Sequence, residues 1–205
     1  MTRARRCEYV SWNRFYRLCT VLHGRICSAG FEPEVIVGIA RGGYMPARVM
    51  ADFFGVMDLA AVKIEHYHGP RKSRKAVVRH PLTADITGRR VLVVDDVSDS
   101  GDTFEALFAH LDAAGPSELR TAVLHHKVTS SHAPDFHATR IVRWRWIIYP
   151  WALAEDLRVL LDAMSPRPRS LDEAGDALRG IHQLVLPRRI LESVAGPVDL
   201  RCRER

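Results

Sequence analysis

The chain has 205 residues, of which 47% are hydrophobic, enough for one globular domain with a sizeable core and a small appendage. No stretch has the apolar length of a membrane span or the pattern of a secretory signal, so we expect a cytoplasmic protein. The formal net charge of +6 comes mainly from arginine and favours anionic partners, either nucleic acid or phosphorylated small molecules. The four cysteines have no paired spacing, which favours reduced thiols over disulfides or a zinc site.

Short apolar runs alternate with amphipathic stretches along most of the chain. Helical spacing of apolar residues predicts helices over 12–29, 44–54 and 102–114. Runs rich in β-branched residues and bounded by turn residues predict strands over 34–40, 60–66, 89–96, 119–127 and 139–148. This alternation is typical of an α/β protein whose parallel sheet carries helices on both faces.

A proline-containing stretch, SPRPRS at 165–170, marks a boundary after this pattern. Beyond it, residues 171–195 have the spacing of one or two amphipathic helices, and a basic tail follows. We therefore expect an α/β domain over 1–164 and a C-terminal helical extension over 165–205.

The stretch VLVVDDVSDSGDT, residues 91–103, places acidic residues at the end of an apolar strand and small hydroxyl residues behind them. Ligands of such sheets bind at the carboxyl ends of the strands, which is where Asp95 and Asp96 fall. Adjacent carboxylates suit ligand hydroxyls and a metal ion, and a helix that opens after Ser98 offers N–H groups and a favourable dipole to a phosphate. Helix capping alone would need one aspartate and would leave the others unexplained.

This stretch resembles the phosphoribosyl-diphosphate (PRPP) binding motif of type I phosphoribosyltransferases. GIARGGYMPA at 38–47 is similar to the family's pyrophosphate loop, and WIIYPW at 146–151 is similar to the base-binding segment of the 6-oxopurine branch. The resemblance spans roughly residues 10–151. It implies a three-layer α/β fold with a mainly parallel twisted sheet in the order 3-2-1-4-5-6, strand 3 antiparallel, and a small base-binding hood.

The resemblance also implies how PRPP is bound. Asp95 and Asp96 would hold the ribose hydroxyls, directly or through Mg²⁺, the expected cofactor, and Asp99 would lie near N7 of the purine as the catalytic base. The positions that would surround the phosphate and the pyrophosphate are Arg41, Gly42, Gly43, Ser98, Ser100, Gly101, Asp102 and Thr103. Asp102 departs from the neutral or basic residue common in the family, and we expect it to turn away as a helix N-terminal charge. The family often has a cis peptide at the position of Ala40–Arg41.

For the base, the resemblance implies that Lys127 donates to a purine O6 and that Trp146 stacks on the ring. The backbone around Ile147 and Ile148 would meet the polar edge of the purine. Residues 66–80 correspond to a mobile loop flanked by an antiparallel strand, although a solvated charged hairpin is an alternative. The candidate phosphate contacts of this loop are Tyr67, Arg71, Lys72 and Lys75.

Two positions near the base site depart from the family pattern. Ile148 stands where xanthine-preferring relatives carry an acid, which argues against a strong xanthine preference. Ala152 stands where many relatives have an aspartate near a second metal, so the anchoring of that metal is left open.

Together these features predict a purine phosphoribosyltransferase of purine salvage, which makes a nucleoside 5′-monophosphate and pyrophosphate from PRPP and hypoxanthine or guanine. The expected partners are PRPP, the purine base and further copies of the chain in a homodimer or homotetramer, with no membrane and no nucleic acid. The alternatives are a phosphoribosyltransferase for another nucleobase and a PRPP-sensing regulator that binds nucleic acid through its arginines. Asp99 favours the enzyme, because regulators on this fold can lose the catalytic acid.

Overall fold

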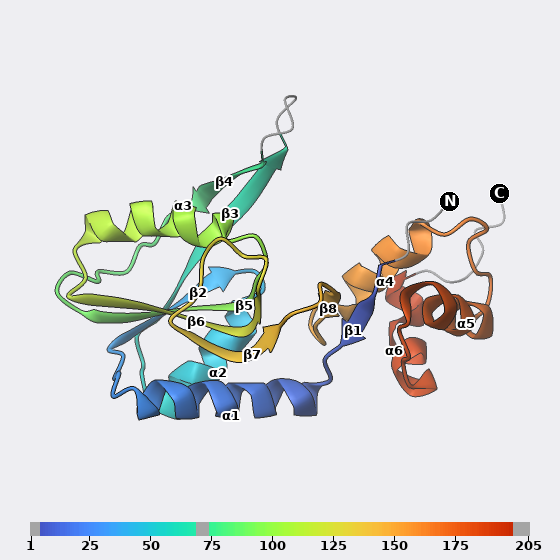
Figure 1. The fold of residues 1–205 in the computed structure, drawn as a ribbon, viewed down its shortest axis with the longest axis horizontal. Coiled ribbons are helices and arrows are strands. Elements are labelled where there is room, and N and C mark those ends of the chain that lie inside the picture. The colour runs from blue at the N-terminus through green and yellow to red at the C-terminus, as the bar shows by residue number, and fades with distance from the viewer. Residues whose placement is uncertain (1–4, 69–73, 199–205) are drawn as a thin grey trace. The chain divides into compact units, whose positions relative to one another are not determined.

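The computed structural model describes residues 5–68 and 74–198. The chain forms two compact units (Figure 1): one comprises residues 16–143, and the other combines 1–15 with 144–205. Within the described ranges, no helix has both the length and the apolar character that crossing a bilayer requires.

The first unit is built on a six-stranded sheet in the order β4-β3-β2-β5-β6-β7. Its strands are β2 (Val35–Ala40), β3 (Leu59–His68), β4 (Arg74–His80), β5 (Arg90–Ser98), β6 (Glu118–Lys127) and β7 (Phe136–Ile141). All neighbouring strands run parallel except β3 and β4. This confirms the fold class, the strand order and the antiparallel strand expected from the sequence. Every residue of β2 is buried, as in parallel strands that are covered on both faces.

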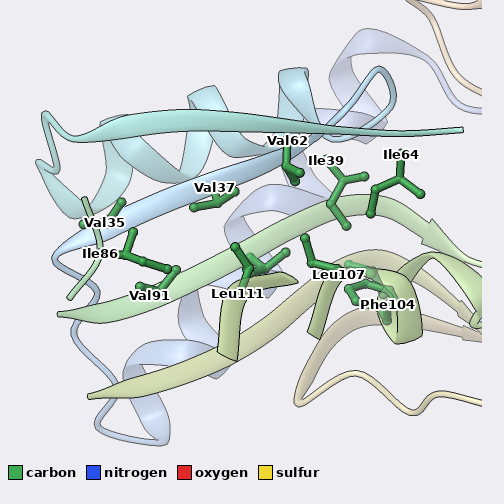
Figure 2. Packing of buried hydrophobic residues seen from close by; sticks show 12 residues of the cluster. Val35, Val37, Ile39, Val62, Ile64, Ile86, Val91, Phe104, Leu107 and Leu111 are labelled. Atoms are coloured by element: carbon green, nitrogen blue, oxygen red, sulfur yellow. The ribbon is translucent and has the colours of Figure 1, made fainter. Parts of the chain in front are cut away.

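Helices cover both faces of this sheet (Figure 1). They are α1 (Trp12–Ser28), α2 (Tyr44–Phe54) and α3 (Asp102–Leu111), the last continued by the short 3₁₀ helix η1 (Asp112–Ala114). Figure 2 shows Phe104, Leu107 and Leu111 of α3 pointing toward strand residues such as Val37 and Val91. Alternate residues of β2 face α2, where a Cβ on Gly38 would lie 3.0 Å from the Cβ of Ala47. Packing of α2 and α3 on the two faces of the sheet therefore fixes the loops that follow β2 and β5.

The prediction of one continuous strand over 139–148 is wrong. β7 ends at Ile141, and β8 (Trp146–Ile148) pairs in parallel with β1 (Cys7–Tyr9) in a separate two-stranded sheet. In the turn before β8, Arg145 donates to Glu8 at 2.6 Å. The apolar residues on the two sides of this turn have the same strand-like composition, so periodicity could not separate the two strands.

The second unit has its own core, to which the C-terminal helices contribute. These helices are α4 (Leu153–Asp162), α5 (Leu171–His182) and α6 (Arg188–Val198). Leu157, Leu178 and Leu191, one from each helix, are buried in a cluster that also contains Ile148 of β8. The helices after residue 164 therefore pack on the strand that carries the expected base-binding residues. The division of the chain into 1–164 and 165–205 stays a proposal.

Leu178→Ala tests whether α5 is an integral part of this core. We expect the free energy of unfolding to fall by roughly 2–5 kcal/mol, because the truncation removes apolar contacts and leaves a cavity. Arg179→Ala is the control: its side chain is exposed and its ion pair with Asp176 is long, 3.6 Å, so the loss should stay below about 1 kcal/mol. Urea unfolding of both variants measures the difference, and equal effects would show that α5 contributes no packing.

Candidate functional site

The residues expected to bind PRPP lie in two loops at the carboxyl ends of β2 and β5, which are neighbours in the sheet. The Ala40–Arg41 peptide is cis, as the resemblance implied. A Cβ on Gly42 would lie 2.3 Å from Oδ2 of Asp96, and a Cβ on Gly43 would lie 2.4 Å from the carbonyl oxygen of Val94. Only glycine lets the first loop approach the second so closely. The structure thus brings the expected pyrophosphate loop against the expected ribose-binding carboxylates.

Asp95 and Asp96 form a pair of adjacent carboxylates at this edge. Asp95 is buried and accepts a bond of 2.8 Å from the backbone N–H of Asp96. Burial, and then the charge of Asp96, hold the pKa of Asp95 well above the usual aspartate range. Two carboxylate oxygens of this kind fit Mg²⁺, which commonly binds through one or two carboxylates and completes its shell with water and substrate phosphates. Within 5–68 and 74–198, no group of three or more His, Cys, Asp or Glu side chains is placed to hold a metal ion.

The loop between β5 and α3 has the geometry of an anion site. Gly101 is the N-cap of α3 with φ 97°, and as a glycine it makes no side-chain capping bond. The first N–H groups of an uncapped helix suit a phosphate. Thr103 and Asp102 lie in the first turn, both partly buried. The expected 5′-phosphate site therefore coincides with a helix start whose N-cap residue is a glycine.

A second loop, residues 130–132 after β6, supports the expected phosphate loop and was not predicted from the sequence. The backbone N–H and the hydroxyl of Ser131 both donate to the carbonyl oxygen of Ser100, each at 2.8 Å. The buried hydroxyl of Ser98 lies 2.7 Å from the Ser130 hydroxyl and donates to the His132 carbonyl at 3.2 Å. The Ser98 side chain thus contacts this loop, while its backbone belongs to the β5–β6 ladder. The sequence feature that could have indicated this loop is the run of small hydroxyl residues after β6.

Lys127 and Asp99 form an ion pair. The family resemblance implied a contact with the purine for each of them, Lys127 with O6 and Asp99 near N7. Lys127 ends β6 with its side chain only 4% exposed, and its Nζ lies 2.7 Å from Oδ2 of Asp99. The Asp99 side chain is 49% exposed, so one end of the pair is open to solvent. The carboxylate is therefore the solvent-exposed partner of a buried ammonium.

In the second unit, Trp146 is held by two side chains that the sequence did not indicate. Its indole N–H donates to Oδ1 of Asp156 at 3.2 Å, and the guanidinium carbon of Arg5 lies 4.9 Å from the ring centroid. Burial raises the pKa of Asp156 to about 6, with a smaller contribution from Glu155, while the indole bond opposes the shift. No sequence motif marks Asp156, which lies ten residues after Trp146 on α4.

One edge of β8 makes its backbone hydrogen bonds with β1 and the residues that flank it. Trp146 donates its N–H to the Arg6 carbonyl at 2.8 Å, and the Ile148 carbonyl accepts from the N–H of Val10 at 2.9 Å. Because backbone groups alternate along a strand, those of Ile147 point to the opposite edge. Of the two isoleucines expected to meet the base, Ile147 has its main chain on the side away from β1.

The expected mobile-loop residues are only partly described. Tyr67 and Lys75 are partners in the β3–β4 ladder. Arg71 and Lys72, and the side chains of Tyr67 and Lys75, lie outside the described part of the structure.

Comparison with known proteins agrees with this geometry. The family model for the phosphoribosyl transferase domain matches residues 7–156. The chain belongs to this family. The xanthine-guanine phosphoribosyltransferase of Cereibacter sphaeroides is 26% identical over 152 residues, which cover 71% of this chain and 87% of that protein. The solved purine phosphoribosyltransferase of Pyrococcus horikoshii is 31% identical, with a TM-score of 0.63, over 71% of this chain and 93% of the other.

The xanthine-guanine-hypoxanthine phosphoribosyltransferase of Helicobacter pylori, 22% identical with a TM-score of 0.62 over 75% of this chain and 97% of that one, shares the fold. These matches confirm the enzyme class expected from the sequence, a purine phosphoribosyltransferase. The family typically uses PRPP with Mg²⁺. The match ends at residue 156, so it leaves α5 and α6 of this phosphoribosyltransferase uncovered.

Asp156→Asn tests the environment of the carboxyl beside Trp146. Because the folded-state pKa of about 6 lies above the ordinary aspartate value, ionisation opposes folding, and its cost appears as the pH rises from about 4 to 6. The Asn variant should therefore be more stable than the wild type by roughly 1–3 kcal/mol at about pH 8, and equally stable below about pH 4. Urea unfolding at both pH values measures this.

Asp162→Asn is the matched control on the same helix. Asp162 forms a surface ion pair with Arg167 at 3.0 Å, with the two side chains 51% and 44% exposed, and its replacement should give no gain at high pH. A stability difference for Asp156→Asn that does not change with pH would contradict the burial of the charge.

Proposed function

We propose that this phosphoribosyltransferase transfers the 5-phosphoribosyl group of PRPP to a 6-oxopurine, hypoxanthine or guanine, and so makes a nucleoside 5′-monophosphate and pyrophosphate. The Lys127–Asp99 pair, 2.7 Å apart, carries the proposal. A 6-oxopurine protonated at N7 presents an acceptor, O6, beside a donor, N7–H. An ammonium only donates and a carboxylate only accepts, so the pair matches that edge of the base.

In the proposed reaction, each residue has a role that its chemistry supports. A ring nitrogen of the purine attacks ribose C1, the bond from C1 to the pyrophosphate breaks, and Asp99 takes the N7 proton. During this step the ammonium of Lys127 donates a hydrogen bond to O6 of the purine. Asp95 and Asp96 hold the ribose hydroxyls and would hold Mg²⁺, which supplies positive charge beside the leaving pyrophosphate.

The remaining proposed contacts hold the pyrophosphate and the 5′-phosphate of PRPP. Arg41 donates to the pyrophosphate, which Gly42 and Gly43 let approach the backbone. The 5′-phosphate lies at the start of α3, within reach of Ser98, Ser100, Gly101, Thr103 and the main chain of Asp102, whose side chain turns away.

The proposed base contacts in the second unit are the Trp146 ring, which stacks on the purine, and the main chain of Ile147, which meets its polar edge. Ile148 offers no side-chain acceptor for a 2-amino group, which favours hypoxanthine slightly over guanine. A homodimer or homotetramer is proposed on the family resemblance alone.

Lys127→Ala tests the recognition of O6. The wild type should prefer hypoxanthine or guanine to adenine by at least about a hundredfold in kcat/KM, because the 6-amino group of adenine opposes the ammonium donor to donor. The variant should lose most of this preference. Initial rates with adenine, hypoxanthine, guanine and xanthine, at saturating PRPP with Mg²⁺, measure it.

Arg120→Ala is the control and should keep the ranking of the bases, because Arg120 lies near the opposite end of β6 from Lys127 and pairs with Glu118 and Asp135. If adenine is the best substrate, or if Lys127→Ala leaves the ranking intact, the 6-oxopurine assignment fails. Absence of turnover together with nucleic-acid binding at physiological salt would favour the regulator instead.

A further inference from the structure

We propose that Asp156, Arg5 and His182 are positioning residues that hold the Trp146 ring in the orientation it needs to stack on the purine. None of the three belongs to the motifs that mark the family in this sequence. The inference rests on the proposed function, because it takes Trp146 as the residue that stacks on the base. It gives the C-terminal extension a part in base binding.

The first contact fixes the edge of the ring. The indole has a single N–H donor, and it is bound to Oδ1 of Asp156 at 3.2 Å. Rotation about the bond that joins the ring to Cβ has broad minima, so packing alone restrains an indole weakly in that angle. Asp156 belongs to the first turn of α4, where its N–H donates to the Ala152 carbonyl at 2.9 Å. A helix thus carries the acceptor that sets the rotation of the ring.

The second contact covers one face of the ring. The guanidinium carbon of Arg5 lies 4.9 Å from the ring centroid, within the range of a cation–π interaction. A purine can therefore stack only on the opposite face of Trp146. The indole would then lie between a cation and the base, with its edge held by a carboxylate.

The third contact holds Arg5 itself, and it comes from the C-terminal extension. His182, at the end of α5, is 1% exposed, and its Nδ1 lies 3.1 Å from the Arg5 carbonyl oxygen and 3.4 Å from the Arg5 nitrogen. We take the shorter contact as a bond that Nδ1–H donates to the carbonyl. The next residue, Arg6, accepts from the N–H of Trp146. A helix beyond the family match is thus linked to the face of the stacking ring.

The loss of folding stability caused by the Asp156 charge supports a role for this residue beyond packing. Burial holds the pKa of this carboxyl at about 6, so at neutral pH the folded protein retains a charge that opposes its stability. A neutral amide of the same shape would avoid this cost. Residues that lower stability are commonly kept where they orient a binding site.

The deciding experiment is Asp156→Ala made in the wild type and in Trp146→Phe. In the wild type we expect KM for hypoxanthine to rise about tenfold, the loss of a bond to a charged group, with KM for PRPP unchanged. In Trp146→Phe, whose ring has no N–H, the same change should have no further effect on KM for hypoxanthine. Asp156→Asn should restore KM to within about threefold, because its amide oxygen accepts from the indole.

Two further variants test the other contacts. Arg5→Ala and His182→Ala should each raise KM for hypoxanthine severalfold and leave KM for PRPP unchanged. Asp162→Ala on α4 should change neither constant, and urea midpoints check that each variant is folded.

The inference fails if Asp156→Ala raises KM for hypoxanthine equally in both backgrounds, or if KM for PRPP rises with it. Both results would mean a general disturbance of the fold. A wild-type protein that turns over no purine would refute the proposed function, whereas an active wild type with normal base binding in Asp156→Ala refutes only the positioning role.

Discussion

The ion pair between Lys127 and Asp99 is the interaction on which the proposed site depends. An ammonium buried to this extent is costly without a partner, and the carboxylate 2.7 Å away supplies one. The two charges come from different strand ends, the end of β6 and the loop after β5. Packing of these parallel neighbours therefore sets the distance between the acceptor and the donor that would read the base.

Close approaches between loops shape the rest of the proposed PRPP site. Gly42 and Gly43 bring the loop after β2 against Asp96 and Val94, and Gly101 lies against Ser131 at the start of α3. A Cβ at Gly43 or Gly101 would meet backbone atoms and push the loops apart, whereas a Cβ at Gly42 would displace the Asp96 carboxylate. The bonds from Ser131 to Ser100 support the proposed phosphate loop from the side of β6, so the ends of β2, β5 and β6 would form one preorganised edge.

Much of the first unit could be predicted from the sequence, because its strands are apolar runs bounded by turns. The helix at 44–54 has the predicted bounds, and the family resemblance gave the strand order. What could not be predicted depends on contacts between residues far apart in the chain. The pairing of β8 with β1 joins residues 146–148 to 7–9, and no local pattern marks such a pair. The same holds for Asp156 beside Trp146 and for Arg5, since a single carboxylate or arginine carries no periodic signal.

The most direct test of paired recognition is a double-mutant cycle of Asp99→Asn and Lys127→Ala, followed through kcat/KM for hypoxanthine. If the two residues act together on the N7–O6 edge, each single change should cost about a hundredfold or more, and the double variant should lose much less than the product of the two losses. Losses that multiply would show that the residues act independently, which would contradict the central claim.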